Sequence, residues 1–233
     1  MSPPRGVPLV YVADLDVPEL DADDHHHLAR VLRVRPGDPV TVGDGRGGWR
    51  PARFAGTRPE PAGPVERVAA PAPPVTLAFA IPKGDRPEWI VQKGTELGVD
   101  VFVPMHCARS VVRWDDGRGP RHVERLRRVA KEAAMQSRRA WLPRVDTPRT
   151  FAACSTLAGA VVAEPGGAAL TTDRLTILVG PEGGFTAEEL ALAPATLGLG
   201  DTVLRVETAA LAAATLATAL RDGRCSPPPG ARS

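Results

Sequence analysis

The feature that most constrains the fold is a series of short apolar segments that alternate with helical ones after residue 74. These segments are "VTLAFAI" (75–81), "VFVPMHC" (101–107), "AVVAEPGG" (160–167) and "LTILVGPEGG" (175–184), the last two ending in glycine-rich turns. Strands that are apolar on both faces are typical of a parallel sheet covered by helices on both sides. The sequence therefore predicts an α/β domain.

The segments between these strands predict helices. "RPEWIVQKGTELGV" (86–99) carries apolar residues at helical spacing and stops at Gly98. We also expect helices over 120–141, 186–193 and 207–222, and a last strand, "TVLRV", over 202–206. Because residues 207–222 are Ala, Leu and Thr on nearly every side, that helix should be buried on most of its surface.

The first seventy or so residues predict a small β-rich unit with strands in 7–12, 38–45, 48–56 and 64–70. One helix interrupts them, with Asp21 as its N-cap and Leu28, Val31 and Leu32 at helical spacing. The Ala/Pro run "AAPAPP" (69–74) is typical of a linker. We therefore predict domains over 1–72 and 73–225, followed by a disordered tail over 226–233.

Composition narrows the class of protein. Net charge is +2, so the overall charge does not indicate a partner. The three cysteines, Cys107, Cys154 and Cys225, are far apart and form no CxxC pair, which suits a reducing cytoplasm and argues against a zinc site. No stretch approaches the ~18–20 apolar residues of a membrane span. We expect a cytoplasmic protein with no membrane segment and no metal.

Two motifs have better structural explanations than functional ones. "GDGRGG" (43–48) matches the GxGxxG nucleotide pattern, but "WRPARF" (49–54) follows it and alternates like a strand, which favours a hairpin turn. His25, His26 and His27 are consecutive, so their side chains diverge on a helix and cannot converge on one ion. A surface or RNA-facing role fits them better.

Basic residues are concentrated between Arg118 and Arg149, where ten Arg or Lys accompany three Asp or Glu. At about 100° per residue, one helical face carries Arg121, Arg125, Arg128 and Arg139, with Arg127, Lys131 and Arg138 on the adjacent stripe. The opposite side is apolar. Runs of charged residues usually form solvent-exposed helix faces, but such faces normally carry both acidic and basic residues. The excess of positive charge here favours a polyanion such as RNA.

The loop Gly180–Gly184 differs from a phosphate loop. It contains Glu182 and no lysine, and the helix start that follows is occupied by a Thr186–Glu189 capping box. The loop therefore suits a neutral or cationic ligand. "AEPGG" (163–167) and "LGLGD" (197–201) have the same form, so the three turns are either ordinary connections or the walls of one pocket.

Taken together, these stretches resemble the RsmE family of SPOUT-class methyltransferases. The resemblance runs almost end to end, through "HHHLARVLRVRPGD", "KGDRPEWIVQKGTELGV", "LVGPEGGFTAEEL" and "LGLGDTVLRVETAALAA". The family implies an enzyme that methylates N3 of one uridine in 16S rRNA with S-adenosyl-L-methionine. It also implies a PUA-like β-barrel N-terminal domain for RNA contact, a C-terminal α/β domain with a trefoil knot around its parallel sheet, and a homodimer acting on 16S rRNA in the small ribosomal subunit.

The resemblance also assigns residues. The cofactor pocket would be lined by Glu164, Val179, Gly180, Pro181, Glu182, Gly183, Gly184, Leu199, Gly200, Val203 and Leu204. RNA would contact His26, Arg30, Arg33, Arg121, Arg125, Arg128, Arg138 and Arg139. A sulfonium cation would explain a glutamate where a phosphate loop has lysine. The chain departs from the family pattern at Gly94, Asp201-Thr202 and Val206, where the family often has Ala, Pro with a basic residue, and Thr.

Methylation of N3 requires removal of its proton or stabilisation of the anion that develops. Candidates for this role are Arg109, Arg139, Arg205 and Glu96, each within a matching block, although any of them could form a structural ion pair instead. Two other functions stay open: a SPOUT enzyme with a different target nucleotide, and a non-catalytic RNA-binding protein of ribosome assembly. A dehydrogenase or NTPase is disfavoured by the chemistry of the loop.

Overall fold

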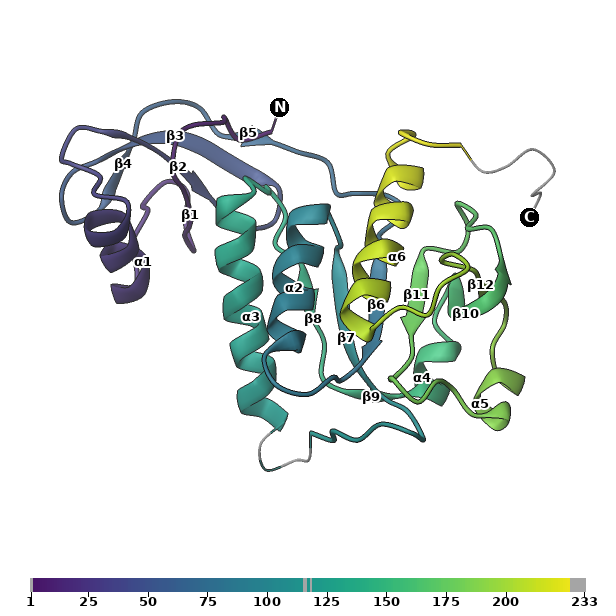
Figure 1. Ribbon diagram of the computed structural model, residues 1–233. Helices are drawn as coiled ribbons and strands as arrows, with labels where there is room; N and C mark the ends of the chain where they lie inside the picture. The colour runs from purple at the N-terminus through teal and green to yellow at the C-terminus, as the bar shows by residue number, and fades with distance from the viewer. Residues whose placement is uncertain (1, 115–116, 118, 227–233) are drawn as a thin grey trace. The chain divides into compact units, whose positions relative to one another are not determined.

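The computed structural model describes residues 2–114, 117 and 119–226 (Figure 1). It divides into two compact units, one of Met1–Pro71 with Lys131–Leu142 and the other of Ala72–Ala130 with Pro143–Ser233. The sequence-based division at residue 72 did not place 131–142 in the first unit. That segment belongs there because Ala134 and Met135 are part of the first unit's hydrophobic core. Apart from Ser226, the predicted tail lies outside the described residues.

The first unit is built on a five-stranded sheet in the order β1-β2-β3-β4, with β5 beside β3. Its strands are β1 (Leu9–Tyr11), β2 (Pro39–Gly43), β3 (Gly48–Phe54), β4 (Pro59–Pro61) and β5 (Glu66–Arg67). The strand pair β2–β3 is antiparallel, and the turn between them is the "GDGRGG" segment. Asp44 Oδ1 accepts hydrogen bonds there from the amides of Arg46 (2.7 Å) and Gly48 (2.9 Å). The predicted hairpin turn is confirmed.

The helix of the first unit begins as predicted. Asp21 caps α1 (Ala22–His26), and its Oδ1 accepts a hydrogen bond from the Asp24 amide at 2.7 Å. The chain then continues as a π-helical turn, η1 (His27–Val31), closed by the Leu32 amide donating to the His27 carbonyl. Leu28 is fully buried, but Val31 and Leu32 are 59% and 46% exposed. The wider π-helical turn rotates Val31 and Leu32 away from the core. Of the three apolar residues predicted to lie on one helical face, only Leu28 is therefore buried.

The second unit contains a seven-stranded sheet in the order β12-β10-β11-β6-β7-β8, with β9 also beside β7, and every pair in it is parallel. Its strands are β6 (Thr76–Ala80), β7 (Val101–His106), β8 (Arg144–Val145), β9 (Arg149–Thr150), β10 (Ala160–Ala168), β11 (Thr176–Val179) and β12 (Thr196–Leu197). The helices are α2 (Arg86–Leu97), α3 (Gly119–Gln136), α4 (Phe151–Ser155), α5 (Ala187–Ala191) and α6 (Val206–Arg221). The predicted α/β fold with a parallel sheet is confirmed.

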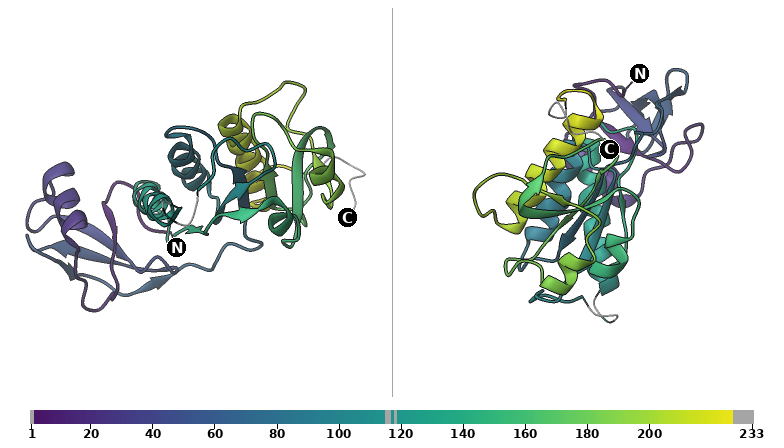
Figure 2. Two further views of the ribbon diagram at one scale, coloured as in Figure 1. Left: turned by 90° about the horizontal axis from the view of Figure 1, so that it is seen from below. Right: turned by 90° about the vertical axis from the view of Figure 1, so that its right-hand side faces the viewer.

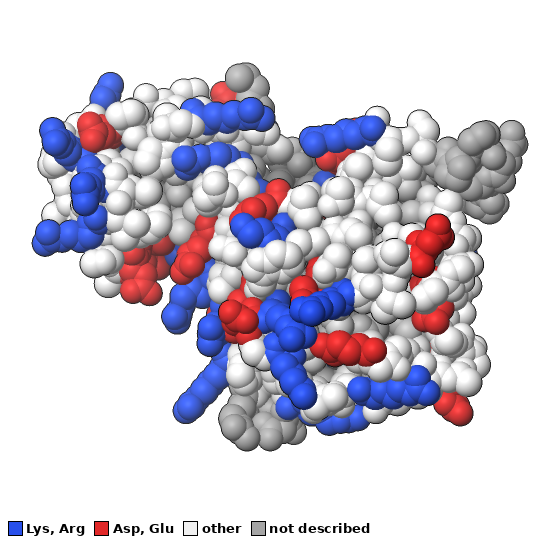
Figure 3. All heavy atoms as spheres, viewed as in Figure 1, with Lys and Arg blue, Asp and Glu red and all other residues white. Residues whose placement is uncertain are grey.

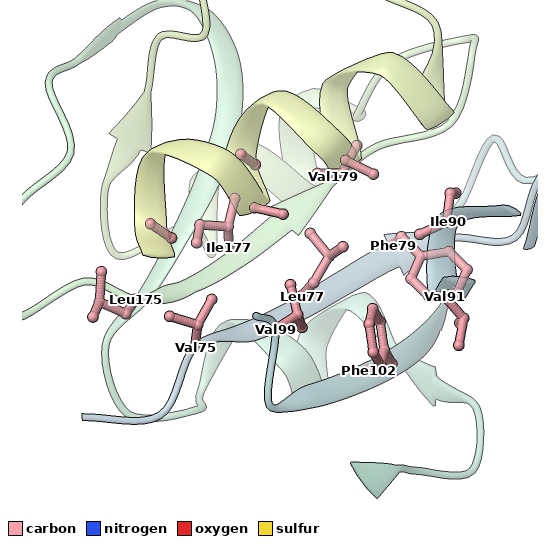
Figure 4. Close-up of a cluster of buried hydrophobic side chains, with 14 of the residues drawn as sticks. Val75, Leu77, Phe79, Ile90, Val91, Val99, Phe102, Leu175, Ile177 and Val179 are labelled. Carbon is pink, nitrogen blue, oxygen red and sulfur yellow. The ribbon is translucent and has the colours of Figure 1, made fainter. Parts of the chain in front are cut away.

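Both faces of this sheet are buried. Leu77 and Phe79 of β6 pack in a cluster with the apolar residues of α2 and α6 (Figure 4). The alternate residues, Ala78 and Ala80, pack on the other face in a cluster with Phe151 of α4 and with Phe185 and Leu190, which lie just before and within α5. Figure 2 shows these two pairs of helices on opposite sides of the strands. Side chains that alternate between two apolar layers explain why the strand sequences contain few polar residues.

Two predicted elements differ from the structure. The segment 202–206 is not a strand: residues 202–205 are irregular, and β12 forms earlier, at Thr196–Leu197 beside β10. The long basic helix ends at Gln136 and not at residue 141, because Arg138 adopts a left-handed backbone conformation with φ of 59°. A helix cannot continue through that conformation.

The last helix is buried as predicted. Ala210, Ala213, Ala214 and Ala217 of α6 are fully buried, and the helix packs against α2 and the sheet. At its end Arg221 Nη1 lies 2.6 Å from Asp100 Oδ2, with the two side chains only 9% and 12% exposed.

The trefoil knot stays a prediction. Within the described residues, no helix is both long enough and apolar enough to span a bilayer.

The departure at Gly94 has a packing explanation. A Cβ on Gly94 would lie 2.7 Å from Cε1 of Phe102, a ring that is fully buried. The phenyl ring therefore occupies the space that a methyl group at residue 94 would need.

We expect Gly94→Ala to destabilise the chain by about 1–3 kcal/mol through overpacking, although Ala is favoured over Gly in a helix by about 1 kcal/mol. Denaturant unfolding would measure the change. The double variant Gly94→Ala with Phe102→Leu should recover much of the loss relative to the two single variants. A Gly94→Ala chain more stable than the wild type would contradict the packing account.

Candidate functional site

The three glycine-bearing segments line one cavity near the carboxyl ends of β10 and β11. The predicted turn at "AEPGG" is wrong: the segment is an irregular part of β10, where Ala163 and Ala168 both pair with Leu197 of β12. The cavity has a volume of about 210 Å³. It is lined by Ala163, Glu164, Pro165, Val179, Gly180, Pro181, Glu182, Gly184, Phe185, Leu199, Gly200, Thr202, Val203, Leu204, Val206 and Ala209. Of the residues that the resemblance assigned to the cofactor pocket, all but Gly183 lie in this lining. The carboxyl edge of a parallel sheet is where ligands bind in α/β folds.

Glycine is required where two of these segments meet. A Cβ on Gly167 would lie 2.4 Å from the carbonyl carbon of Leu197, and a Cβ on Gly198 would lie 2.7 Å from the carbonyl oxygen of Gly167. Backbone lies against backbone at this point, which only residues without a side chain permit. The "AEPGG" segment of β10 and the "LGLGD" segment that begins in β12 are therefore one structural feature, and together they hold one side of the cavity.

The loop between β11 and α5 is fixed from two sides. Arg109 Nη1 donates to the carbonyl oxygens of Gly183 (2.9 Å) and Phe185 (3.2 Å). The predicted capping box is present: Glu189 Oε2 accepts from the Thr186 amide, and the Glu189 amide donates to Thr186 Oγ1. Gly183 faces Arg109 and not the cavity, which explains its absence from the lining.

The cavity carries negative charge. Glu164 and Glu182 are the charged residues among the described residues that line it. Although the loop itself contains no basic residue, a distant one accompanies Glu182: Arg86 Nη1 lies 2.9 Å from Glu182 Oε1. The same Arg86 atom also lies 4.0 Å from Glu207 Oε2, so one guanidinium faces two carboxylates. Because two carboxylates face a single guanidinium, the net charge at this point is still negative and disfavours an anionic ligand.

The catalytic candidates lie in different places. The Arg109 guanidinium binds the loop as described above. Glu96 accepts hydrogen bonds from Lys93 Nζ at 2.8 and 3.1 Å near the end of α2, and it does not line the cavity. Arg205 is exposed at the N-cap of α6. Arg139 belongs to the first unit, where its carbonyl oxygen accepts a hydrogen bond from the Tyr11 hydroxyl at 2.6 Å. Within the second unit, Glu96, Arg109 and Arg205 lie on different elements, and none of them lines the cavity.

The basic face of α3 is exposed as predicted, with Val123, Leu126 and Ala130 buried on its inner side. Figure 3 shows Lys and Arg side chains projecting from the surface over this helix. Because the helix ends at Gln136, Arg138 and Arg139 are not part of that face. Burial lowers the pKa of Arg138, whose Nη1 lies 3.5 Å from the Met135 carbonyl oxygen.

Several of these cations already have acidic partners. Arg125 Nε lies 2.8 Å from Glu88 Oε1, and Arg127 pairs with Glu124. Lys131 Nζ lies 2.8 Å from Asp24 Oδ2 in the first unit. Burial alone would lower the pKa of Lys131, but its hydrogen bonds and attraction to Asp24 and to Asp21 outweigh burial and raise it. Arg121 and Arg128 are exposed on the same helix. The face is therefore less positive than the sequence implied.

In the first unit, His26, Arg30 and Arg33 are exposed, and Arg33 has a left-handed backbone with φ of 54°. His25 instead packs inward, with Nε2 3.0 Å from the Gly56 carbonyl oxygen. The neighbouring side chains of His25 and His26 therefore have different environments, one packed inward and one exposed.

Comparison with known proteins identifies the chain's relatives. Residues 70–218 match a family described as an RNA methyltransferase domain, and residues 20–60 match one described as an RNA methyltransferase PUA domain. A ribosomal RNA small subunit methyltransferase E from Mycobacterium tuberculosis is 38% identical over 219 residues, covering 83% of each chain. The chain belongs to the ribosomal RNA small subunit methyltransferase E (RsmE) family. The resemblance is confirmed.

Solved structures agree. An RsmE from Neisseria gonorrhoeae bound to S-adenosyl methionine superposes with a TM-score of 0.77 at 26% identity, covering 89% of this chain and 95% of that one. A methyltransferase from Legionella pneumophila in complex with the same cofactor gives a TM-score of 0.81 at 26% identity, covering 91% and 97%. The architecture of both units is therefore that of the family.

Sequence reasoning missed several residues of the cavity. Phe185 directly follows the "GPEGG" motif, so its position next to the loop could have identified it as a lining residue of the cavity. Val206 and Ala209 come from the first turn of α6 and required the tertiary structure. Val206, one of the positions at which the sequence was expected to depart from the family pattern, gives the cavity an apolar side chain at this point.

We expect Gly180→Ala to impair cofactor binding. A Cβ there would lie 2.8 Å from Cε2 of Phe185. That ring is buried, and its centroid lies 5.1 Å from that of Phe151, so it cannot easily move aside. Calorimetric titration with S-adenosylmethionine should show affinity lower by about tenfold, which corresponds to ~1.4 kcal/mol.

Gly43→Ala in β2 is the matched control, because its Cβ would make only ordinary contacts of 3.4 Å or more. Equal affinity of the Gly180→Ala variant and the wild type would refute the assignment of this loop to the cofactor.

Proposed function

We propose that this chain transfers a methyl group from S-adenosyl-L-methionine to N3 of one uridine in 16S rRNA. The observation that carries the proposal is the cavity at the carboxyl edge of the sheet, in a chain of the RsmE family. A relative with the same architecture is described as bound to this cofactor. The cavity fits such a ligand, because its charged lining is acidic and S-adenosylmethionine carries a sulfonium cation and no phosphate.

The cofactor supplies a methyl group that is already activated, so the chain's own residues must bind and align. Gly180, Pro181 and Gly184 would contact it through their backbones, and Glu164 and Glu182 would face its positive charges. Arg109 acts on the loop's geometry by binding two of its carbonyl oxygens. In this proposal Arg109 is a positioning residue and not the group that removes the N3 proton.

The RNA would be held by positive charge. Arg121 and Arg128 on α3 are exposed, as are His26, Arg30 and Arg33 in the PUA unit. Few aromatic residues are available, since they make up 4% of the chain, so we infer recognition of folded RNA by its shape and backbone. We further propose that the enzyme is a homodimer that acts in the cytoplasm on RNA of the small ribosomal subunit.

A non-catalytic RNA-binding protein is the alternative from another class of function. Such a protein needs the basic surfaces but has no use for an acidic cavity lined by three glycine-bearing segments. The cavity therefore favours the enzyme.

The direct test is mass spectrometry of 16S rRNA nucleosides. RNA from a strain without this gene should lack one 3-methyluridine, and incubation with the purified chain and S-adenosylmethionine should restore it. Methylation at a different nucleotide would favour another SPOUT activity. Binding of RNA without any methylation would favour the non-catalytic alternative.

A second prediction concerns charge in the cavity. Glu164→Gln should weaken binding of S-adenosylmethionine more than binding of S-adenosylhomocysteine, because the latter has a neutral sulfur. We expect the ratio of the two dissociation constants to change by about threefold to tenfold, as for one partly solvated charge pair worth ~1 kcal/mol.

Calorimetric titration of both ligands would measure this ratio. Glu188→Gln, at an exposed carboxylate in the first turn of α5, is the control. An equal loss for both ligands would show that Glu164 contributes through shape or hydrogen bonding and not through charge.

A further inference from the structure

A second cavity lies at the same edge of the sheet. It has a volume of about 460 Å³ and is lined by Pro82, Gly84, Pro87, Glu88, Val111, Val112, Arg113, Trp114, His122 and Arg125. Its walls come from the segments that follow β6 and β7, whereas the cofactor cavity follows β10 and β11. Because β11 is hydrogen-bonded to β6, the two cavities are neighbours along one sheet edge.

The two cavities also share a connection through the start of α2. Arg86 binds Glu182 in the wall of the cofactor cavity, and Pro87 and Glu88, the next two residues, line the second cavity. A group held at Glu88 is therefore held close to the cofactor loop.

Glu88 has an unusual environment for a glutamate. Its side chain is 17% exposed, and Oε1 lies 2.8 Å from Arg125 Nε. Its other oxygen, Oε2, is buried and accepts no hydrogen bond in the described part of the chain. A buried carboxylate oxygen without a donor is costly, so it calls for an explanation such as a ligand that supplies the donor.

The rest of the lining suits a flat, polar ring. Trp114 and His122 stack with their ring centroids 4.7 Å apart and an interplanar angle of 12°. The Trp114 amide donates to His106 Nε2 at 3.3 Å, which ties this segment to the end of β7. Arg113 and Arg125 bring guanidinium donors to the same cavity. The site thus combines an aromatic surface, one carboxylate and two cations.

We propose that this cavity receives the uracil ring of the substrate and that Glu88 is the general base for its N3. The inference rests on the proposed function. Uracil presents an N3–H donor between two carbonyl acceptors, which matches a cavity that offers one carboxylate and two guanidinium groups. Enzymes that modify a base commonly take it out of the helix into such a pocket and stack it on aromatic side chains.

In the reaction, the Glu88 carboxylate takes the N3 proton, and N3 keeps the electron pair of the broken N–H bond. N3 uses that pair to bond the methyl carbon while the carbon–sulfur bond breaks and its pair stays on sulfur. The product is 3-methyluridine beside a neutral sulfide, and Glu88 then releases its proton to solvent. Arg113 and Arg125 stabilise the negative charge that develops on the carbonyl oxygens of the ring.

The same arrangement selects uracil over cytosine. Cytosine has no proton on N3, so its lone pair would face the carboxylate of Glu88 and leave both groups without a donor. Sites built to bind a hydrogen-bond donor reject analogues that lack it. The cavity thus gives a physical reason for base specificity.

The test is the Glu88→Gln variant, assayed in single turnover on 16S rRNA that lacks the modification. Loss of a general base should slow methylation by about 100-fold or more near neutral pH. The deficit should shrink as the pH rises toward the range in which uridine itself loses its N3 proton. Affinity for S-adenosylmethionine and thermal stability should stay near the wild-type values, which separates lost chemistry from misfolding.

Glu188→Gln, another glutamate in the first turn of a helix, is the control and should methylate normally. Wild-type methylation with an equally active Glu88→Gln variant would overturn this inference alone. A deficit in methylation rate that does not change with pH would also overturn it. Loss of a purely structural ion pair with Arg125 should slow methylation by the same factor at every pH. An inactive wild type would contradict the proposed function as well.

A second variant tests the aromatic surface through RNA binding alone, with no methyl transfer. Trp114→Ala should weaken binding of the unmodified RNA, measured in the absence of S-adenosylmethionine, whereas Trp114→Phe should restore much of it. Trp89→Ala is the matched control, because Trp89 is 42% exposed on the same helix as Glu88 and does not line the cavity. Equal RNA affinity of Trp114→Ala and the wild type would remove the stacking role.

Discussion

The parallel sheet of the second unit, buried on both faces, is the constraint on which the rest depends. Leu77 and Phe79 pack against α2 and α6, and Ala78 and Ala80 pack on the opposite side. The middle of each strand therefore has no room for polar chemistry. Functional groups can stand only where the strands end, and in a parallel sheet all strands end at one edge. Both cavities lie along that edge.

Charge then distinguishes the two cavities. Glu164 and Glu182 make the first acidic, which suits a cationic cofactor. The second combines Glu88 with Arg113 and Arg125, which suits a neutral ring that has both donors and acceptors. Arg86 binds Glu182, and the next two residues, Pro87 and Glu88, line the second cavity, so the start of α2 contributes to both sites. In this proposal the same helix turn aligns the methyl donor with its acceptor.

The RNA-facing surfaces depend on which cations are already paired. Arg125 binds Glu88, Arg127 binds Glu124, and Lys131 binds Asp24. Each acidic partner reduces the positive charge that a phosphate would meet. Long-range attraction of RNA therefore relies more on exposed arginines such as Arg121 and Arg128 than on the full count of basic residues.

The sequence by itself determined the α/β class, the hairpin at "GDGRGG", the Asp21 cap, the Thr186–Glu189 capping box and the family. These follow from local chemistry or from motif identity, neither of which needs distant contacts. Only the tertiary structure decided that Arg86 accompanies Glu182, that Arg109 holds the loop, and that Glu88 lines a cavity. These partners are separated by many residues in the chain, and no periodicity encodes such pairings. The left-handed turn at Arg138 and the π-helical turn before Leu32 were missed for the related reason that packing overrides local helix propensity.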